Sequence, residues 1–268
     1  MIVGGVRCHT GMEILESDDG TPIAYQRTGS GPALVLVVGA FCDRTSTASL
    51  TPLLAPHFTV YEYDRRGRGD SGAGGEYAVE REIEDLAAVV AAAGGSALGF
   101  GHSSGAILAL EAAACGVPLT RLALYEPPYT APPGSAGDDT MLDAVRARLA
   151  AGDPDGAAEA FMTGAGAPPE QVAGARQSPW WPRMRALAPT LVHDLVLCNR
   201  GVVPRERLAK VAVPTLALSG GESPPWAARA CADVAAAVHG ARTRVLEGQT
   251  HGAADDVLAP VLVEWFLS

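Results

Sequence analysis

The segment Gly101-His102-Ser103-Ser104-Gly105 places a hydroxyl side chain between two glycines. Residues 97–100 form a short apolar run before it, and residues 104–115 after it predict a helix. A serine between strand and helix occupies a sharp, strained turn, where small neighbours let the two elements approach. We therefore interpret Ser103 as a nucleophile rather than as a capping serine in a glycine-rich loop. The N–H of Ser104, at the helix N-terminus, is a candidate donor to an oxyanion.

A serine hydroxyl is a weak nucleophile until a base removes its proton. His251 follows an expected strand at 243–246 and precedes an expected helix at 255–267, so it is the candidate base. His102 fills the variable position of the turn, where its ring is expected to point away from substrate. The remaining histidines are interpreted as surface or core residues: His9, His57, His193 and His239.

Strands and helices alternate around these residues. Two short runs flanking Asp18-Asp19-Gly20 predict a hairpin, and the later apolar runs are typical of strands buried on both faces. This alternation predicts an open, mostly parallel sheet with right-handed crossovers. The expected strands are 12–16, 23–27, 33–38, 58–63, 97–100, 121–125, 215–219 and 243–246, and the expected helices are 79–93, 104–115 and 255–267.

Residues 128–205 interrupt this alternation. They are rich in proline, glycine and alanine, and they contain helical stretches at 141–151 and 154–161. We interpret them as a helical lid over the carboxyl edge of the sheet, inserted into a core formed by 1–127 and 206–268. Aromatic residues there either line an apolar substrate pocket or form the lid's own core. The pocket candidates are Trp180 and Trp181, with Phe41 from the core.

Three further segments resemble one family. The letters DRRGRGDS at 64–71 resemble the DxRGxGxS segment of the α/β-hydrolase superfamily, and VGAF at 38–41 resembles its oxyanion loop. VPTL at 213–216 resembles the start of its penultimate strand. With the turn at Ser103, the likeness spans nearly the whole chain apart from the insertion. It implies the α/β-hydrolase fold and a serine hydrolase in which residues 64–71 brace a loop rather than react.

The resemblance also implies where an oxyanion would bind. The family's loop usually begins His-Gly, whereas this chain has Val38-Gly39. Main-chain donors do not depend on that histidine. The expected donors are the N–H groups of Ser104 and Ala40, or of Phe41 if the alignment shifts by one residue.

The acid that orients the histidine departs from the family pattern. In many relatives an Asp stands three residues after a glycine beyond the penultimate strand, and here that position is Ser223. Some members, such as certain haloalkane dehalogenases, have a Glu at the end of the strand after the elbow helix, which favours Glu126. The candidates are Glu126, Glu222 and Asp255.

Composition limits the remaining possibilities. Asp and Glu number 30 against 20 Lys and Arg, giving a net charge of −10, and no basic stripe suggests nucleic-acid binding. The five cysteines are scattered without a CxxC pair, so we expect free thiols and no metal site. No apolar run reaches the roughly 18 residues of a membrane span, and the N-terminus lacks the pattern of a secretory signal. We expect a cytoplasmic protein without cofactor that binds a small, apolar molecule.

Three functions fit these residues. The first is hydrolysis of an ester or related carbonyl compound through an acyl-enzyme at Ser103. The second is C–C bond hydrolysis, or a lyase or cyclase reaction of secondary metabolism, on the same fold. The third is an inactive member that binds a small ligand. The sequence does not predict the substrate or the oligomeric state.

Overall fold

The computed structural model describes residues 8–132 and 134–268 and contains an eight-stranded sheet of order β1-β2-β4-β3-β5-β6-β7-β8. The two strand pairs that involve β2 are antiparallel, and the other pairs are parallel. The expected parallel sheet is therefore present, with the predicted hairpin at its edge. The strands are β1 Cys8–Glu16, β2 Pro22–Gly29, β3 Ala33–Val37, β4 Thr59–Tyr63, β5 Ala97–His102, β6 Leu119–Tyr125, β7 Thr215–Gly220 and β8 Arg242–Leu246.

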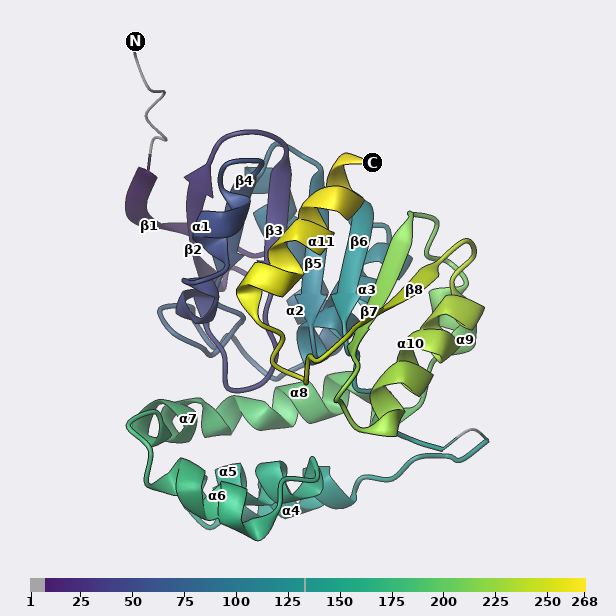
Figure 1. Ribbon diagram of the computed structural model, residues 1–268. Coiled ribbons are helices and arrows are strands. Elements are labelled where there is room, and N and C mark those ends of the chain that lie inside the picture. The colour runs from purple at the N-terminus through teal and green to yellow at the C-terminus, as the bar shows by residue number, and fades with distance from the viewer. Residues whose placement is uncertain (1–7, 133) are drawn as a thin grey trace.

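Alternation along the strands builds a core on each face of the sheet. In β3, Val35 and Val37 join a cluster under helices α2, α3, α9 and α10, whereas Leu34 and Leu36 join a second cluster under α1 and α11. Figure 1 shows α11 lying across the near face of the sheet. These helices are α1 Thr51–Leu54, α2 Val79–Ala92, α3 Ser104–Ala114, α9 Arg205–Leu208, α10 Pro225–Ala237 and α11 Asp255–Leu267.

The helices of residues 140–197, between β6 and β7, form a separate layer, which we call the cap. Figure 1 shows these helices grouped below the carboxyl ends of the strands, with α8 nearest the sheet. Val145, Ala157, Trp181 and Leu191 are among the residues of the cap's own hydrophobic cluster. The cap helices are α4 Thr140–Ala150, α5 Pro154–Gly164, α6 Pro169–Arg176, α7 Trp181–Leu187 and α8 Leu191–Leu197, and short 3-10 helices occur at Arg44–Thr47, Ala188–Thr190 and Asn199–Gly201.

The strand order reverses at β3, which pairs with β4 on one side and β5 on the other. In open α/β sheets, ligands bind outside the carboxyl ends of the strands at such a reversal. Residues that follow β3, β5 and β6 are therefore brought together at the edge that the cap covers. Within the described ranges, none of the helices combines the length and apolar character that a bilayer crossing requires.

Candidate active site

Ser103 connects β5, which ends at His102, to α3, which begins at Ser104. Its backbone has φ 56° and ψ −127°, a conformation that L-residues rarely adopt and that concentrates at functional sites. A Cβ on Gly105 would lie 2.1 Å from the carbonyl oxygen of Val37, and one on Gly101 would lie 2.5 Å from the Cα of Ala106. Only glycine therefore fits at the two flanking positions.

Glu126 follows β6 directly, at the end of the strand adjacent to β5, and its side chain is fully buried. Its Oε2 lies 2.6 Å from Nδ1 of His251, while its Oε1 accepts a 2.7 Å hydrogen bond from the main-chain N–H of Gly220. In the described structure, neither Glu222 nor Asp255 forms a hydrogen bond with His251. Glu126 is thus the one of the three candidate acids that contacts the candidate base.

The contacts of Glu126 determine its charge. Burial alone would raise its pKa, but the hydrogen bonds from His251 and from the N–H of Gly220 lower the pKa overall. An ionised carboxylate accepts a hydrogen bond from Nδ1–H, which leaves Nε2 of His251 as the basic nitrogen. The His251 side chain is 43% exposed, so this nitrogen lies on an accessible ring.

The residues immediately before Ser103 and Glu126 hold the loop that bears His251. His102 and Tyr125 are paired across β5 and β6. The ring nitrogen Nε2 of His102 lies 2.9 Å from the carbonyl oxygen of His251, and the Tyr125 hydroxyl donates to the carbonyl of Thr250. Burial and the neighbouring charge of His251 lower the pKa of His102 to about 4, so its ring is neutral and donates from Nε2.

Sequence reasoning missed both of these loop contacts. Tyr125 gave no signal beyond its place in an apolar strand. The position of His102 in the turn was noted, but its partner lies 149 residues away along the chain.

Gly39 of the expected oxyanion loop packs directly against the candidate nucleophile. A Cβ at Gly39 would lie 2.8 Å from Cβ of Ser103 and 3.4 Å from its Oγ. The loop continues through Ala40 to Phe41, which has φ 58°. Ser104 is the first residue of α3, where main-chain N–H groups have no acceptor within the helix. The two expected N–H donors thus belong to segments that meet at Ser103.

Comparison with known proteins identifies the family of the chain. A family model described as the Alpha/beta hydrolase family matches residues 34–261. The chain belongs to this family. A crystal structure of an alpha/beta hydrolase from Sphaerobacter thermophilus has 49% identity and a TM-score of 0.89, covering 95% of this chain and 100% of that one. A hydrolase structure from Pseudomonas aeruginosa has 26% identity and a TM-score of 0.75, covering 97% and 98%.

A curated relative is similar over a shorter stretch. N-formylmaleamate deformylase from Pseudomonas putida is 38% identical over 108 residues, which is 39% of this chain and 40% of that protein. The matched segment therefore spans less than half of the relative's length.

Residues 64–71 of this alpha/beta hydrolase form a tight turn. Asp64 accepts hydrogen bonds from the main-chain N–H groups of Arg44, at 2.7 Å, and Asp70, at 2.9 Å. The side chains of Arg65 and Arg68 are buried and contact the main-chain carbonyls of residues 38 and 39 in the expected oxyanion loop and of residue 42, which directly follows it. This segment contacts the expected oxyanion loop, and its hydrogen bonds do not reach Ser103, Glu126 or His251.

The two tryptophans of the cap have different surroundings. Trp180 is 66% exposed, whereas Trp181 is 7% exposed and donates from Nε1 to Asp155 at 2.7 Å. Phe41 meets Phe161 of the cap edge to face, with ring centroids 5.3 Å apart. Trp181 therefore packs in the cap's own core, Trp180 lies largely in solvent, and Phe41 joins the oxyanion loop to the cap.

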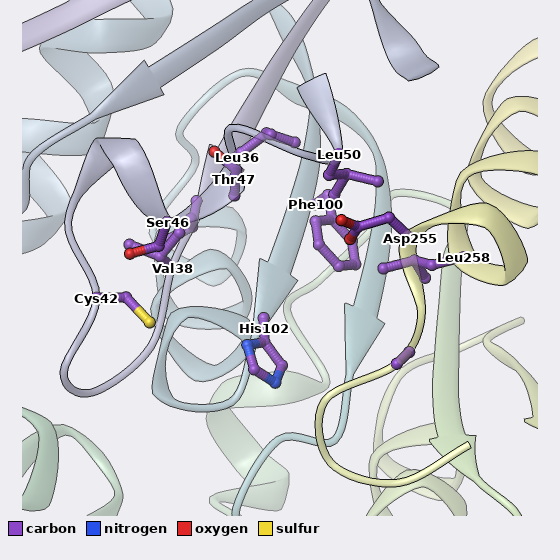
Figure 2. Close-up of a pocket in the computed structure, with 12 residues that line it drawn as sticks. Leu36, Val38, Cys42, Ser46, Thr47, Leu50, Phe100, His102, Asp255 and Leu258 are labelled. Atoms are coloured by element: carbon purple, nitrogen blue, oxygen red, sulfur yellow. The ribbon is translucent and has the colours of Figure 1, made fainter. Parts of the chain in front are cut away.

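A cavity of about 110 Å³ lies beside the site, between β3, the loop after it and the start of α11. In Figure 2, His102 lies below the other labelled lining residues, and Asp255 lies at the right, beside Phe100. The lining of the cavity does not include Ser103 or His251. Asp255 thus borders a neighbouring cavity rather than the candidate base.

Proposed function

We propose that this alpha/beta hydrolase is a serine hydrolase that cleaves an ester or related carbonyl substrate through an acyl-enzyme at Ser103. The observation that supports this most directly is the 2.6 Å contact between His251 and Glu126. A nucleophilic serine requires a base that a third group orients, and this contact provides that orientation at the strand end adjacent to Ser103.

In the proposed mechanism, Nε2 of His251 takes the proton of Ser103 as its oxygen attacks the carbonyl carbon. The N–H groups of Ala40 and Ser104 stabilise the oxyanion of the tetrahedral intermediate. His251 then protonates the leaving group, and the acyl-enzyme forms. A water molecule, deprotonated by His251, releases the acid and restores Ser103.

Glu126 has an electrostatic role in this proposal. Its ionised carboxylate fixes the tautomer of His251 and stabilises the imidazolium that forms during attack. Because the hydrogen bonds to Glu126 keep its pKa below the ordinary value, the carboxylate stays charged at neutral pH.

A second candidate is hydrolysis of an N-formyl amide. The similarity to N-formylmaleamate deformylase favours it, since that relative's name describes removal of a formyl group. The same serine, histidine and glutamate would serve, with a primary amide as the leaving group whose nitrogen His251 protonates. The two candidates differ in the bond that is cleaved and share the nucleophile.

The test compares p-nitrophenyl acetate with an N-formyl amide as substrates of the purified protein. We expect turnover of at least one, loss of about 10⁶ in kcat for Ser103→Ala, and labelling of wild type by a fluorophosphonate probe. The substrate that is turned over faster shows whether the protein acts as an esterase or as a deformylase. Unchanged turnover and labelling in Ser103→Ala would show that the nucleophile assignment is wrong. A wild-type protein inert to both substrates and to the probe would favour the inactive, ligand-binding alternative.

A further inference from the structure

A buried charge cluster lies beneath the oxyanion loop. Its members are Arg65, Arg68, Glu82 and Asp194, each at most 2% exposed. Arg65 pairs with Glu82 at 2.6 Å and with Asp194 at 2.8 Å, and Arg68 donates twice to Asp194 at 2.8 Å. The two positive and two negative charges balance within the cluster. Buried charges of this kind persist only when they are paired and hydrogen-bonded.

Asp194 is the only member of this cluster from the cap, where it lies on α8. Its Oδ1 also accepts a 2.6 Å hydrogen bond from the hydroxyl of Ser104, the residue after the candidate nucleophile. Asp194 therefore contacts both arginines and the first residue of α3. Opposite charges and these hydrogen bonds keep the pKa of Asp194 below its ordinary value despite burial, so it is ionised.

The arginines determine the orientation of the oxyanion loop. Arg68 donates to the carbonyl of Gly39 and to that of Cys42, while Arg65 donates to the carbonyl of Val38 at 3.3 Å. In a trans peptide, the carbonyl of one residue and the N–H of the next point in opposite directions. When Arg68 holds the Gly39 carbonyl, the N–H of Ala40 must point away from the cluster. Gly39 packs on Ser103, so the Gly39–Ala40 peptide lies beside the candidate nucleophile.

We infer that Asp194 is a positioning residue that, through Arg68 and Ser104, fixes both oxyanion N–H donors in place. Because Asp194 belongs to the cap, the arrangement of these donors depends on the cap being packed against the core. The inference rests on the proposed function, because it assigns these donors to the reaction. Asp194 itself touches no reacting atom. If α8 separates from the sheet, Arg68 loses its carboxylate partner and the Gly39–Ala40 peptide loses its constraint.

The chain offers a matched control for Asp194. Arg66 lies between Arg65 and Arg68 in the turn of residues 64–71. It forms a buried pair with Asp85 of α2, with hydrogen bonds of 2.7 Å to both carboxylate oxygens. The other contacts of Arg66 are to Asp19 and to the carbonyl of Arg81, and not to the oxyanion loop. Asp85→Asn therefore perturbs a buried arginine–aspartate pair without changing the orientation of the Ala40 peptide.

The experiment compares Asp194→Asn with Asp85→Asn in the full chain. Two readouts are used: kcat and KM for p-nitrophenyl acetate per folded molecule, and the amide resonance of Ala40 in ¹⁵N-labelled protein. For Asp194→Asn we expect kcat to fall about 10- to 100-fold with KM within about twofold, since oxyanion contacts act in the transition state. The Ala40 resonance should move. For Asp85→Asn, both readouts should match wild type.

If Asp194→Asn has the same kcat per folded molecule as wild type and its Ala40 resonance does not move from the wild-type position, the inference is overturned. A wild-type protein without esterase activity would contradict the proposed function, yet the Ala40 resonance would still decide the role of Asp194 in orienting the loop. If Asp194→Asn does not fold, Arg68→Lys replaces it. Arg68 donates to the Gly39 and Cys42 carbonyls from Nη1 and to Asp194 from Nη2, and lysine lacks this second nitrogen, so the same shifts are expected. An unchanged Ala40 resonance in that variant would also overturn the inference.

Discussion

Ser103 and Glu126 both have a positive φ angle, which non-glycine residues rarely adopt. Their φ angles are 56° and 49°, and they lie at the ends of neighbouring parallel strands. Each such residue costs about 1–3 kcal/mol and persists only where surrounding contacts hold it. Here the N–H of Ser103 donates to the carbonyl of Tyr125 and the N–H of Glu126 donates to that of Leu218, both at 2.9 Å. The strained residues are thus anchored by the strand that lies beside each.

Replacing Glu126 with Gln should lower kcat by about 10²- to 10⁴-fold with little change in KM. The amide keeps the shape but cannot fix the tautomer of His251 or stabilise its charged form. Steady-state kinetics with the preferred substrate provide the measurement. Glu222→Gln is the control and should retain near wild-type kcat, because Glu222 forms no hydrogen bond with His251 in the described structure. A larger loss in Glu222→Gln than in Glu126→Gln would reverse the assignment.

His102 should make folding stability depend on pH. Its pKa is lowered from 6.5 to about 4 in the folded protein, so the unfolded chain binds more protons between these values. The stability that neutral His102 contributes is complete above pH 6.5 and is lost as pH falls toward 4, by up to about 1.4 kcal/mol per pH unit. Urea unfolding at pH 7 and at pH 5 measures this change in the free energy of unfolding. His102→Gln, which cannot titrate, should show a smaller difference, and an equal difference would contradict the shift.

The individual site residues that could be predicted from the sequence are those that a short local pattern identifies. Ser103 lies within five residues that specify a turn, and His251 lies between an expected strand and helix. The position of Glu126 at a strand end left it one of three candidates, because contact with His251 depends on folding across 125 residues. Asp194 was missed because an acid on a helix is usually a surface charge, and its burial arises only when the cap meets the core.

Close packing of β3 against α3 is the feature that positions the candidate nucleophile Ser103. Gly105→Ala would place a methyl group 2.1 Å from the carbonyl oxygen of Val37, which belongs to the backbone and cannot move aside. We expect a loss of more than about 2 kcal/mol in the free energy of unfolding. Gly174 is the control, because it lies in α6 with nothing within 4 Å of an added Cβ. Gly174→Ala should stabilise by about 0.5–1 kcal/mol. Urea denaturation measures both, and equal effects would contradict the packing argument.

Most elements of the core could be predicted because their hydrophobic periodicity is clear. The observed β3, β4 and α2 lie within one residue of the expected ranges, and α11 has the expected range. Helix α10, Pro225–Ala237, was missed although it buries Ala227, Ala230, Cys231 and Val234 at helical spacing. Alanine is weakly apolar, so a helix that packs through alanines gives a weak amphipathic signal.

The cap and the core meet through a few specific contacts. Phe41 packs on Phe161, Arg183 of α7 pairs with Asp43, and Asp194 joins the buried cluster. The sequence predicted helices in this region, but the side chains that face the site depend on how those helices dock on the sheet. Pocket residues could therefore not be predicted from aromatic composition, as the two tryptophans demonstrate.

Substitution of the two adjacent tryptophans should affect the cap unequally. Trp181→Ala removes a buried ring and its hydrogen bond to Asp155, so we expect a loss of about 3–5 kcal/mol in stability. Trp180→Ala removes a side chain that is 66% exposed and should change stability by less than about 0.5 kcal/mol. Thermal unfolding followed by circular dichroism measures both. Similar losses would show that Trp180 also packs in the cap.

The location of the acyl group during turnover tests the proposed acyl-enzyme at Ser103 without relying on loss of activity. Wild-type protein is mixed with excess p-nitrophenyl acetate, quenched with acid within the first turnovers and mapped by peptide mass spectrometry. If Ser103 is the nucleophile, one acetyl group is expected on the peptide containing Ser103, and none on that peptide in Ser103→Ala. Rapid turnover with acetyl on another residue, or with Ser103→Ala as active as wild type, would contradict that assignment.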